Sequence, residues 1–200
     1  LVRTLTGADV DAVRAVLTVP VVGVVPPIKP AAPLTRTGVI GLLATPATVK
    51  RAYTDDLIAQ FAADKKVVRH GSAPLVQAAE QKLRGETPDA AALADALNGL
   101  FGAPDGGADI EVVALACTHF PLLRRELADA APRAAVWLDS GEAIARRVAH
   151  VLGEAAGAAR VRFAGFTDAV SARSLSPALQ ARGFAAFIQI GPPPVFAPAP

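Results

Sequence analysis

Short runs of β-branched and other apolar residues recur along the chain, separated by longer segments in which apolar and polar residues alternate. Continuous apolar runs are typical of strands that are buried on both faces, as in a parallel sheet. Seven segments fit this pattern: 19–25, 39–44, 66–69, 110–116, 136–138, 161–163 and 184–190. The run 110–116 is the strongest of these, and it predicts a central strand.

Between these runs, apolar residues recur at helical spacing. In 47–63 they stand four residues apart and form one stripe of a helix, and 72–83 and 89–100 show similar stripes. Thr45-Pro46 supplies a capping residue and a first-turn proline. Asp139 and Glu142 resemble the two ends of a capping box before a helix over 143–153. Strands that alternate with helices predict an α/β fold with a mainly parallel sheet flanked by helices.

Composition narrows the classes of protein that fit. The 200 residues carry a net charge of +2, too small to indicate binding to nucleic acid or to an anionic membrane. No apolar run approaches the roughly 18 residues that span a bilayer, and no signal peptide is visible. A single cysteine excludes an internal disulfide and favours a cytoplasmic setting. Because the sequence begins at Leu1 and contains no methionine, we expect a fragment, ending in a proline-rich, disordered tail at 191–200.

The candidate chemistry follows the fourth run, where Cys117-Thr118-His119 precedes a helix beginning at Phe120-Pro121. Ligands of open α/β sheets bind at the carboxyl ends of strands, and a helix N-terminus favours a thiolate. Thr118 is expected to cap this helix, and its backbone N–H suits a carboxylate. His119 can relay or stabilise a proton. A lone cysteine is also commonly a small buried apolar residue, so the residue types alone leave both readings open.

Four motifs resemble the glutamate racemases of the aspartate/glutamate racemase superfamily. The sequence Ala-Cys-Thr-His-Phe-Pro-Leu-Leu at 116–123 resembles the second cysteine motif of that family. Three further segments agree with the family in order and spacing: 19–29, 43–50 with Tyr53, and 138–145. The resemblance covers about residues 19–152, and four motifs in register are far more specific than one short pattern.

The resemblance implies two pseudo-symmetric α/β domains with glutamate bound between them, and racemisation without cofactor or metal. One cysteine removes the α-proton from one face, and a second cysteine protonates the other face. The D-glutamate formed supplies bacterial peptidoglycan. By this resemblance Cys117 and His119 are catalytic, while Thr118, His119 and Thr48 bind the substrate.

The family's other half-site has no counterpart before residue 19. It comprises an Asp-Ser-Gly loop, a Pro-Tyr-Gly segment and a Cys-Asn-Thr motif, and its cysteine is expected near Val2. The Asp-Ser-Gly at 139–141 lies elsewhere in the family pattern and is expected to cap a helix. We therefore expect a complete domain at 22–134 carrying Cys117, an incomplete domain from 1–21 and 135–200, and impaired activity.

Two other functions remain open at this point. One is a non-catalytic remnant or binding module with the racemase fold. The other is a Cys-His hydrolase with Cys117 as nucleophile, for which the sequence shows no clear orienting acid. Glutamate is the expected partner, without nucleic acid or membrane, and a homodimer is a candidate assembly. The remaining polar residues near these motifs are expected to be structural or solvated: Arg51, His70, Ser72, Glu80 and His150. For Glu80 the resemblance also leaves a site role open, since the family often carries a glutamate in this region that contacts or lines the site.

Overall fold

The computed structural model describes residues 7–18, 20–153, 163–166 and 169–191. In chain order the elements are α1 (Gly7–Val16), α2 (Ile28–Ala31), the 3₁₀ helix η1 (Ala32–Leu34), β1 (Val39–Ala44), α3 (Pro46–Val49), α4 (Ala52–Phe61), β2 (Lys66–Gly71), α5 (Pro74–Leu83), α6 (Ala90–Phe101), η2 (Gly107–Asp109), β3 (Val112–Leu115), η3 (Phe120–Leu123), α7 (Arg124–Ala130), β4 (Val136–Leu138), α8 (Gly141–Leu152), β5 (Phe163–Phe166), α9 (Ala169–Gln180) and β6 (Ala186–Gln189). Within these residues, no helix is long and apolar enough to cross a membrane.

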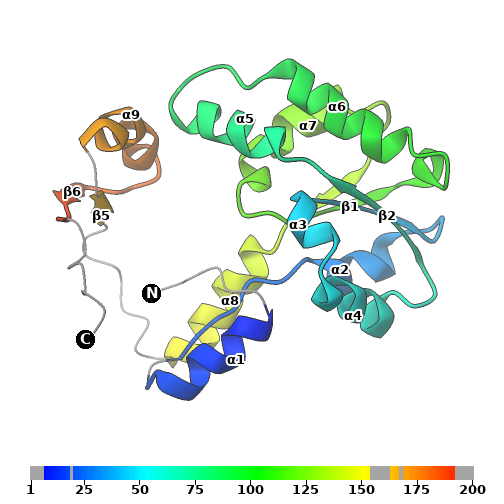
Figure 1. The fold of residues 1–200 in the computed structure, drawn as a ribbon, viewed down its shortest axis with the longest axis horizontal. Coiled ribbons are helices and arrows are strands. Elements are labelled where there is room, and N and C mark those ends of the chain that lie inside the picture. The colour runs from blue at the N-terminus through cyan, green and yellow to red at the C-terminus, as the bar shows by residue number, and fades with distance from the viewer. Residues whose placement is uncertain (1–6, 19, 154–162, 167–168, 192–200) are drawn as a thin grey trace, which may run out of the picture.

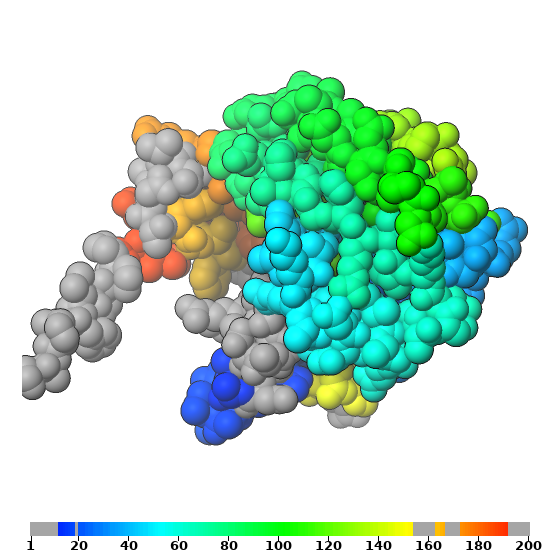
Figure 2. All heavy atoms as spheres, turned by 45° about the vertical axis from the view of Figure 1, so that its right-hand side comes forward, coloured from blue at the N-terminus to red at the C-terminus, as the bar shows by residue number. Residues whose placement is uncertain are grey.

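The main sheet has four parallel strands in the order β2-β1-β3-β4, with helices on both faces (Figure 1). One core cluster joins α5, α6 and α7 to one face through Leu43, Val113 and Leu115. A second joins α2 and α4 to the other face through Ile40 and Val112. β1 and β3 are buried along their whole length. The predicted α/β fold with a parallel sheet flanked by helices is therefore confirmed. In Figure 2 the side chains of the region from α3 to α6, coloured cyan to green, form one continuous surface.

The strand predicted at 19–25 is wrong for the residues that the structure describes, since 20–25 form no strand. Two of their backbone carbonyls accept hydrogen bonds from side chains, not from a neighbouring strand. Arg14 donates to the carbonyl of Val21, and Ser140 Oγ donates to that of Val25 at 2.5 Å. In the predicted strand 161–163, only Phe163 lies within the described residues, as the first residue of β5.

The helix predicted over 47–63 is divided into α3 and α4 at Lys50-Arg51. Thr45 caps α3 as expected, because its Oγ1 accepts the N–H of Thr48 at 3.3 Å. The hydroxyl of buried Thr54 donates to the carbonyl of Thr48 at 2.8 Å, and this contact fixes the corner between the two helices. The break sets Thr48 and Arg51 beside the carboxyl ends of the strands.

The capping box predicted before α8 does not form, since the helix begins at Gly141 and its N-cap Ser140 makes no capping bond with its side chain. The carboxylate of Asp139 accepts the N–H of Gly141 at 2.7 Å instead. At the end of the chain, β5 and β6 form a separate two-stranded parallel sheet, connected by α9.

Candidate active site

Cys117 lies just beyond the carboxyl end of β3, as the sequence predicts. The strand ladder continues to Ala116, whose N–H donates to the carbonyl of Leu43 at 2.8 Å. The chain then turns, and the N–H of Phe120 donates to the carbonyl of Cys117 at 3.2 Å. The half-buried thiol packs against the core cluster beneath α5, α6 and α7. A central strand of a fixed sheet therefore positions the sulfur.

His119 connects this thiol to a carboxylate on α5. Its Nδ1 lies 3.9 Å from Cys117 Sγ, and its Nε2 lies 3.0 Å from Glu80 Oε1. The second oxygen of Glu80 accepts from Arg84 at 3.1 Å. If the carboxylate of Glu80 accepts the Nε2–H, the unprotonated Nδ1 faces the sulfur. The three side chains thus form a path along which a proton can pass between thiol and imidazole.

The electrostatic surroundings of Cys117 differ from the sequence expectation. Burial raises the pKa of the thiol, and the backbone N–H groups of His119 and Phe120 only partly offset this effect. The turn does supply N–H donors to the sulfur, but desolvation of the thiolate raises the pKa by more than these donors lower it. A neighbouring base is therefore needed to generate the thiolate near neutral pH, and His119 is in place for this.

Thr118 does not cap the following helix, so that prediction is wrong. The helix is the short 3₁₀ element η3, its N-cap is His119, and no side chain caps it. Thr118 is exposed and points into a pocket. Its hydroxyl and N–H are therefore available to a ligand.

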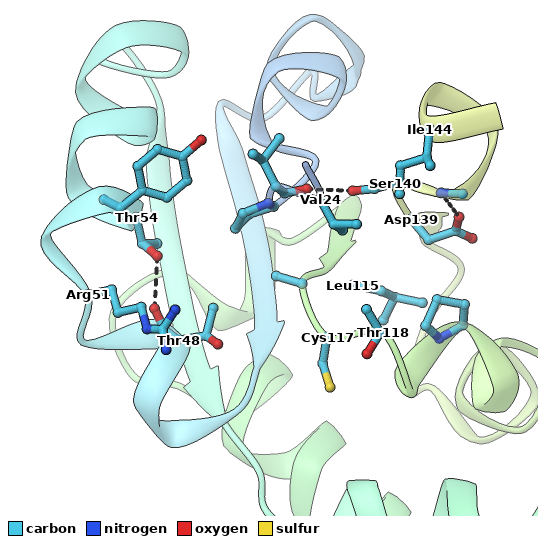
Figure 3. A pocket seen from close by; sticks show the side chains of 16 residues that line it. Val24, Thr48, Arg51, Thr54, Leu115, Cys117, Thr118, Asp139, Ser140 and Ile144 are labelled. Atoms are coloured by element: carbon cyan, nitrogen blue, oxygen red, sulfur yellow. Dashed lines mark hydrogen bonds between the residues drawn. The ribbon is translucent and has the colours of Figure 1, made fainter. Parts of the chain in front are cut away.

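This pocket, of about 490 Å³, lies at the carboxyl ends of β1 and β3. Figure 3 shows Thr48 and Arg51 on one wall, Asp139, Ser140 and Ile144 on the opposite wall, and Cys117 with Thr118 at the strand end between them. The remaining lining is Val24, Val25, Pro26, Tyr53, Thr54, Leu115, Ala116, Pro121 and Gly141. A mostly apolar cleft with a few polar groups is typical of a small-molecule site.

The structure brings Cys117, Thr118 and Thr48 onto one pocket, and it places His119 behind the thiol against Glu80. Of the other candidates weighed, His70 lies in β2 against Gly99 of α6, and His150 is exposed on α8. Ser72 is buried, and its Oγ accepts the N–H of Leu75 at 3.4 Å. Ser72 thus holds the start of α5 and His150 lies at the surface, as expected, whereas His70 lies in a strand and not in the predicted loop.

Two residues that the sequence favoured as solvated belong to the site. For Glu80 the resemblance had left a site contact open, and the structure shows it contacting His119. Its spacing from partly buried Val76 and Leu83 also places it on the packed side of α5. Arg51 was also expected to be solvated, but it lines the pocket, and its guanidinium has no hydrogen-bond or ion-pair partner among the described residues. No sequence signal separates Arg51 from neighbouring Lys50. Within the part of the chain that the structure describes, no three His, Cys, Asp or Glu side chains gather as a metal site.

Known proteins are similar to this chain in sequence and in fold. The Asp/Glu/Hydantoin racemase family model matches residues 6–148. A glutamate racemase of Sphingopyxis alaskensis is 55% identical over 139 residues, which cover 70% of this chain and 52% of that protein. A Shewanella glutamate racemase is 51% identical over 152 residues, covering 76% and 54%. The chain thus spans about half the length of these curated relatives.

Solved structures agree with the sequence matches. The crystal structure of Escherichia coli glutamate racemase in complex with L-glutamate and the activator UDP-MurNAc-Ala matches with a TM-score of 0.83 at 41% identity, covering 93% of this chain and 70% of that one. Thermus thermophilus glutamate racemase in complex with β-chloro-D-alanine matches with a TM-score of 0.60 at 28% identity, covering 90% and 66%. From its motifs, its fold and these matches, this chain belongs to the Asp/Glu/Hydantoin racemase family.

Proposed function

We propose that this chain carries the acid/base site for one face of the substrate in a cofactor-independent glutamate racemase. The observation that carries the proposal is the contact series Cys117–His119–Glu80 at the carboxyl end of β3, beside a pocket that the same thiol lines. The names of its relatives support glutamate as the substrate.

In this mechanism Nδ1 of His119 takes the thiol proton of Cys117, and Glu80 stabilises the imidazolium through Nε2–H. The thiolate then removes the α-proton of the amino acid, which leaves a carbanion and regenerates the thiol. Return of a proton from the same sulfur to the same carbon restores the starting enantiomer. In water this cycle exchanges the α-proton with solvent, and the raised pKa of the thiol makes its thiolate a stronger base for the removal step.

The pocket supplies groups that suit an acidic amino acid. We propose that Thr48 and Thr118 donate hydrogen bonds to the substrate, and that the guanidinium of Arg51 attracts its carboxylates. Asp139 is engaged with the N–H of Gly141 and lies 3.9 Å from Arg124, so its negative charge is partly compensated. The pocket thus favours an anionic ligand at its α3–α4 wall.

Inversion at the α-carbon needs a second acid/base group on the opposite face. The 200-residue sequence contains one cysteine, so we propose that this chain alone exchanges the α-proton on one face and does not racemise efficiently. The division into a complete domain at 22–134 and an incomplete one at 1–21 and 135–200 belongs to the same proposal. We also propose that the protein is cytoplasmic, that it serves peptidoglycan synthesis and that it assembles as a homodimer.

The test is loss of the α-proton signal of L- and D-glutamate in D₂O, followed by NMR. Exchange that disappears in Cys117→Ala and persists in Glu86→Ala, a change at an exposed residue outside the site, supports the proposal. Absence of exchange with both enantiomers contradicts it and favours the binding-module reading, which calorimetric titration with glutamate then tests.

A cysteine hydrolase is a second candidate, because the structure provides in Glu80 the orienting acid that the sequence did not reveal. The arrangement of thiol, imidazole and carboxylate is the one that nucleophilic cysteines use. Family membership favours proton transfer instead. Multiple-turnover hydrolysis of an ester distinguishes the two, since only a hydrolase repeatedly forms and releases an acyl group on Cys117.

A further inference from the structure

The turn after Cys117 is held against α5 at two places. The first is the contact between His119 and Glu80 described above. The second is Lys82, two residues further along the same helix. Its Nζ donates to the carbonyl of Leu122 at 2.7 Å and lies 2.6 Å from Oε1 of Glu126. One side chain thus joins α5 to η3 and α7 together.

The element that Lys82 holds has little internal support. η3 is a single 3₁₀ turn without a side-chain cap, and such turns have poorer hydrogen-bond geometry than α-helices. The carbonyl of Leu122 lies at its end, where intrahelical partners run out. Lys82 satisfies that carbonyl with a charged donor, and the opposite charge of Glu126 holds the ammonium in place.

Lys82 and Glu126 form a partly buried ion pair. The side chains of Lys82 and Glu126 are only 33% and 29% exposed, so water screens them less than a surface pair. Burial acts to raise the pKa of Glu126, but the hydrogen bond from Lys82, a backbone hydrogen bond and the charges of Lys82 and Arg125 lower it overall. Glu126 is therefore a carboxylate at neutral pH.

We propose that Lys82 is a positioning residue, which keeps η3 against α5 so that His119 stays between Cys117 and Glu80. Its importance for proton transfer rests on the function proposed above. The distance from Sγ to Nδ1 is already long at 3.9 Å, so a small outward movement of the turn separates the two atoms. Glu80 would then keep only Arg84 as its partner.

The test measures the reactivity of Cys117 without any substrate. Because Cys117 is the only cysteine in the sequence, its alkylation by iodoacetamide is read directly by intact mass between pH 6 and 10. Lys82→Met and Glu126→Gln are compared with the wild type and with Arg69→Met. The last variant removes the Arg69–Asp55 pair and the bond from Arg69 to the carbonyl of Val49, and neither contact involves the turn after Cys117 or α5.

The two site variants separate positioning from a simple charge effect. Through-space electrostatics predicts opposite changes, since loss of the lysine disfavours the thiolate and loss of the carboxylate favours it. Positioning predicts that both variants slow alkylation at pH 7 in the same direction, on the order of tenfold, as expected when a small displacement separates reacting groups. Lys82→Arg should retain most of the wild-type rate, and Arg69→Met should leave it unchanged.

Three results would overturn the proposal: opposite shifts in the two variants, a wild-type alkylation profile in both, or an equal decrease in Arg69→Met. If Lys82→Met does not fold, Glu126→Gln and Lys82→Arg still decide the outcome, since wild-type reactivity in Glu126→Gln alone contradicts positioning. Failure of glutamate exchange in the wild type would refute the proposed function but would not alter this measurement.

Discussion

Removal of the Glu80 carboxylate should slow α-proton exchange without weakening substrate binding. The contact between Glu80 and His119 spans 3.0 Å, and both side chains are about one-third exposed, at 30% and 34%. A hydrogen bond to a charged group contributes roughly 1.5–3 kcal/mol when well shielded. With partial screening by water we take about 1 kcal/mol, which corresponds to a fall in rate of roughly fivefold.

The assay is the exchange rate of glutamate in D₂O as a function of its concentration, for wild type, Glu80→Ala and Glu86→Ala. Glu80 does not line the pocket, so kcat for exchange should fall in Glu80→Ala while KM stays within about twofold. The exposed Glu86 should tolerate alanine. A raised KM with unchanged kcat, or a wild-type rate in Glu80→Ala, would refute a role for this carboxylate in proton transfer.

Three further predictions concern packing and titration. Gly99→Ala should destabilise the fold by about 1–3 kcal/mol, because a Cβ at this position would overlap the imidazole ring of His70. An unchanged Tm in calorimetry would show that the ring moves aside freely. Burial lowers the pKa of His70 in the folded protein below the ordinary histidine value of about 6.5. As the pH falls from that value through the lower pKa of the folded state, the unfolded chain binds a proton first, so the free energy of unfolding should decrease. His70→Gln should flatten that decrease in urea unfolding at pH 7 to 5, and parallel curves would contradict it. Burial raises the pKa of Cys117, so its alkylation midpoint should lie above the value of about 8.5 for a free thiol, and a lower midpoint would show that the backbone donors prevail.

Two strands of the main sheet could be predicted closely from their apolar runs. The run at 39–44 coincides with β1, and the run at 136–138 coincides with β4. β1 is a central strand buried along its whole length, as expected of a parallel sheet between helices, whereas β4 lies at the edge of the sheet and only its Trp137 is buried. The run at 19–25 has the same composition, but its described residues have no strand beside them, and the sequence does not encode the missing neighbour locally.

The site was predictable where position along a strand defines it. Cys117 follows β3, and the topology of parallel strands sets its place at the edge of the sheet. Glu80 and Lys82 could not be assigned in this way, because their partners lie 39 and 40 or more residues away in sequence. A charged residue on a helix has the same local pattern whether it faces solvent or a neighbouring turn. Arg51 depends on the break between α3 and α4, which the continuous apolar stripe concealed.

The central claim is that Cys117 acts on one face of the α-carbon. It is tested most directly by comparing solvent exchange and optical inversion for each enantiomer of glutamate in the same D₂O sample. We predict that one enantiomer loses its α-proton signal while its optical rotation is retained, that the other exchanges far more slowly, and that Cys117→Ala abolishes the difference. Equal exchange of both enantiomers, or exchange that survives in Cys117→Ala, would contradict the account.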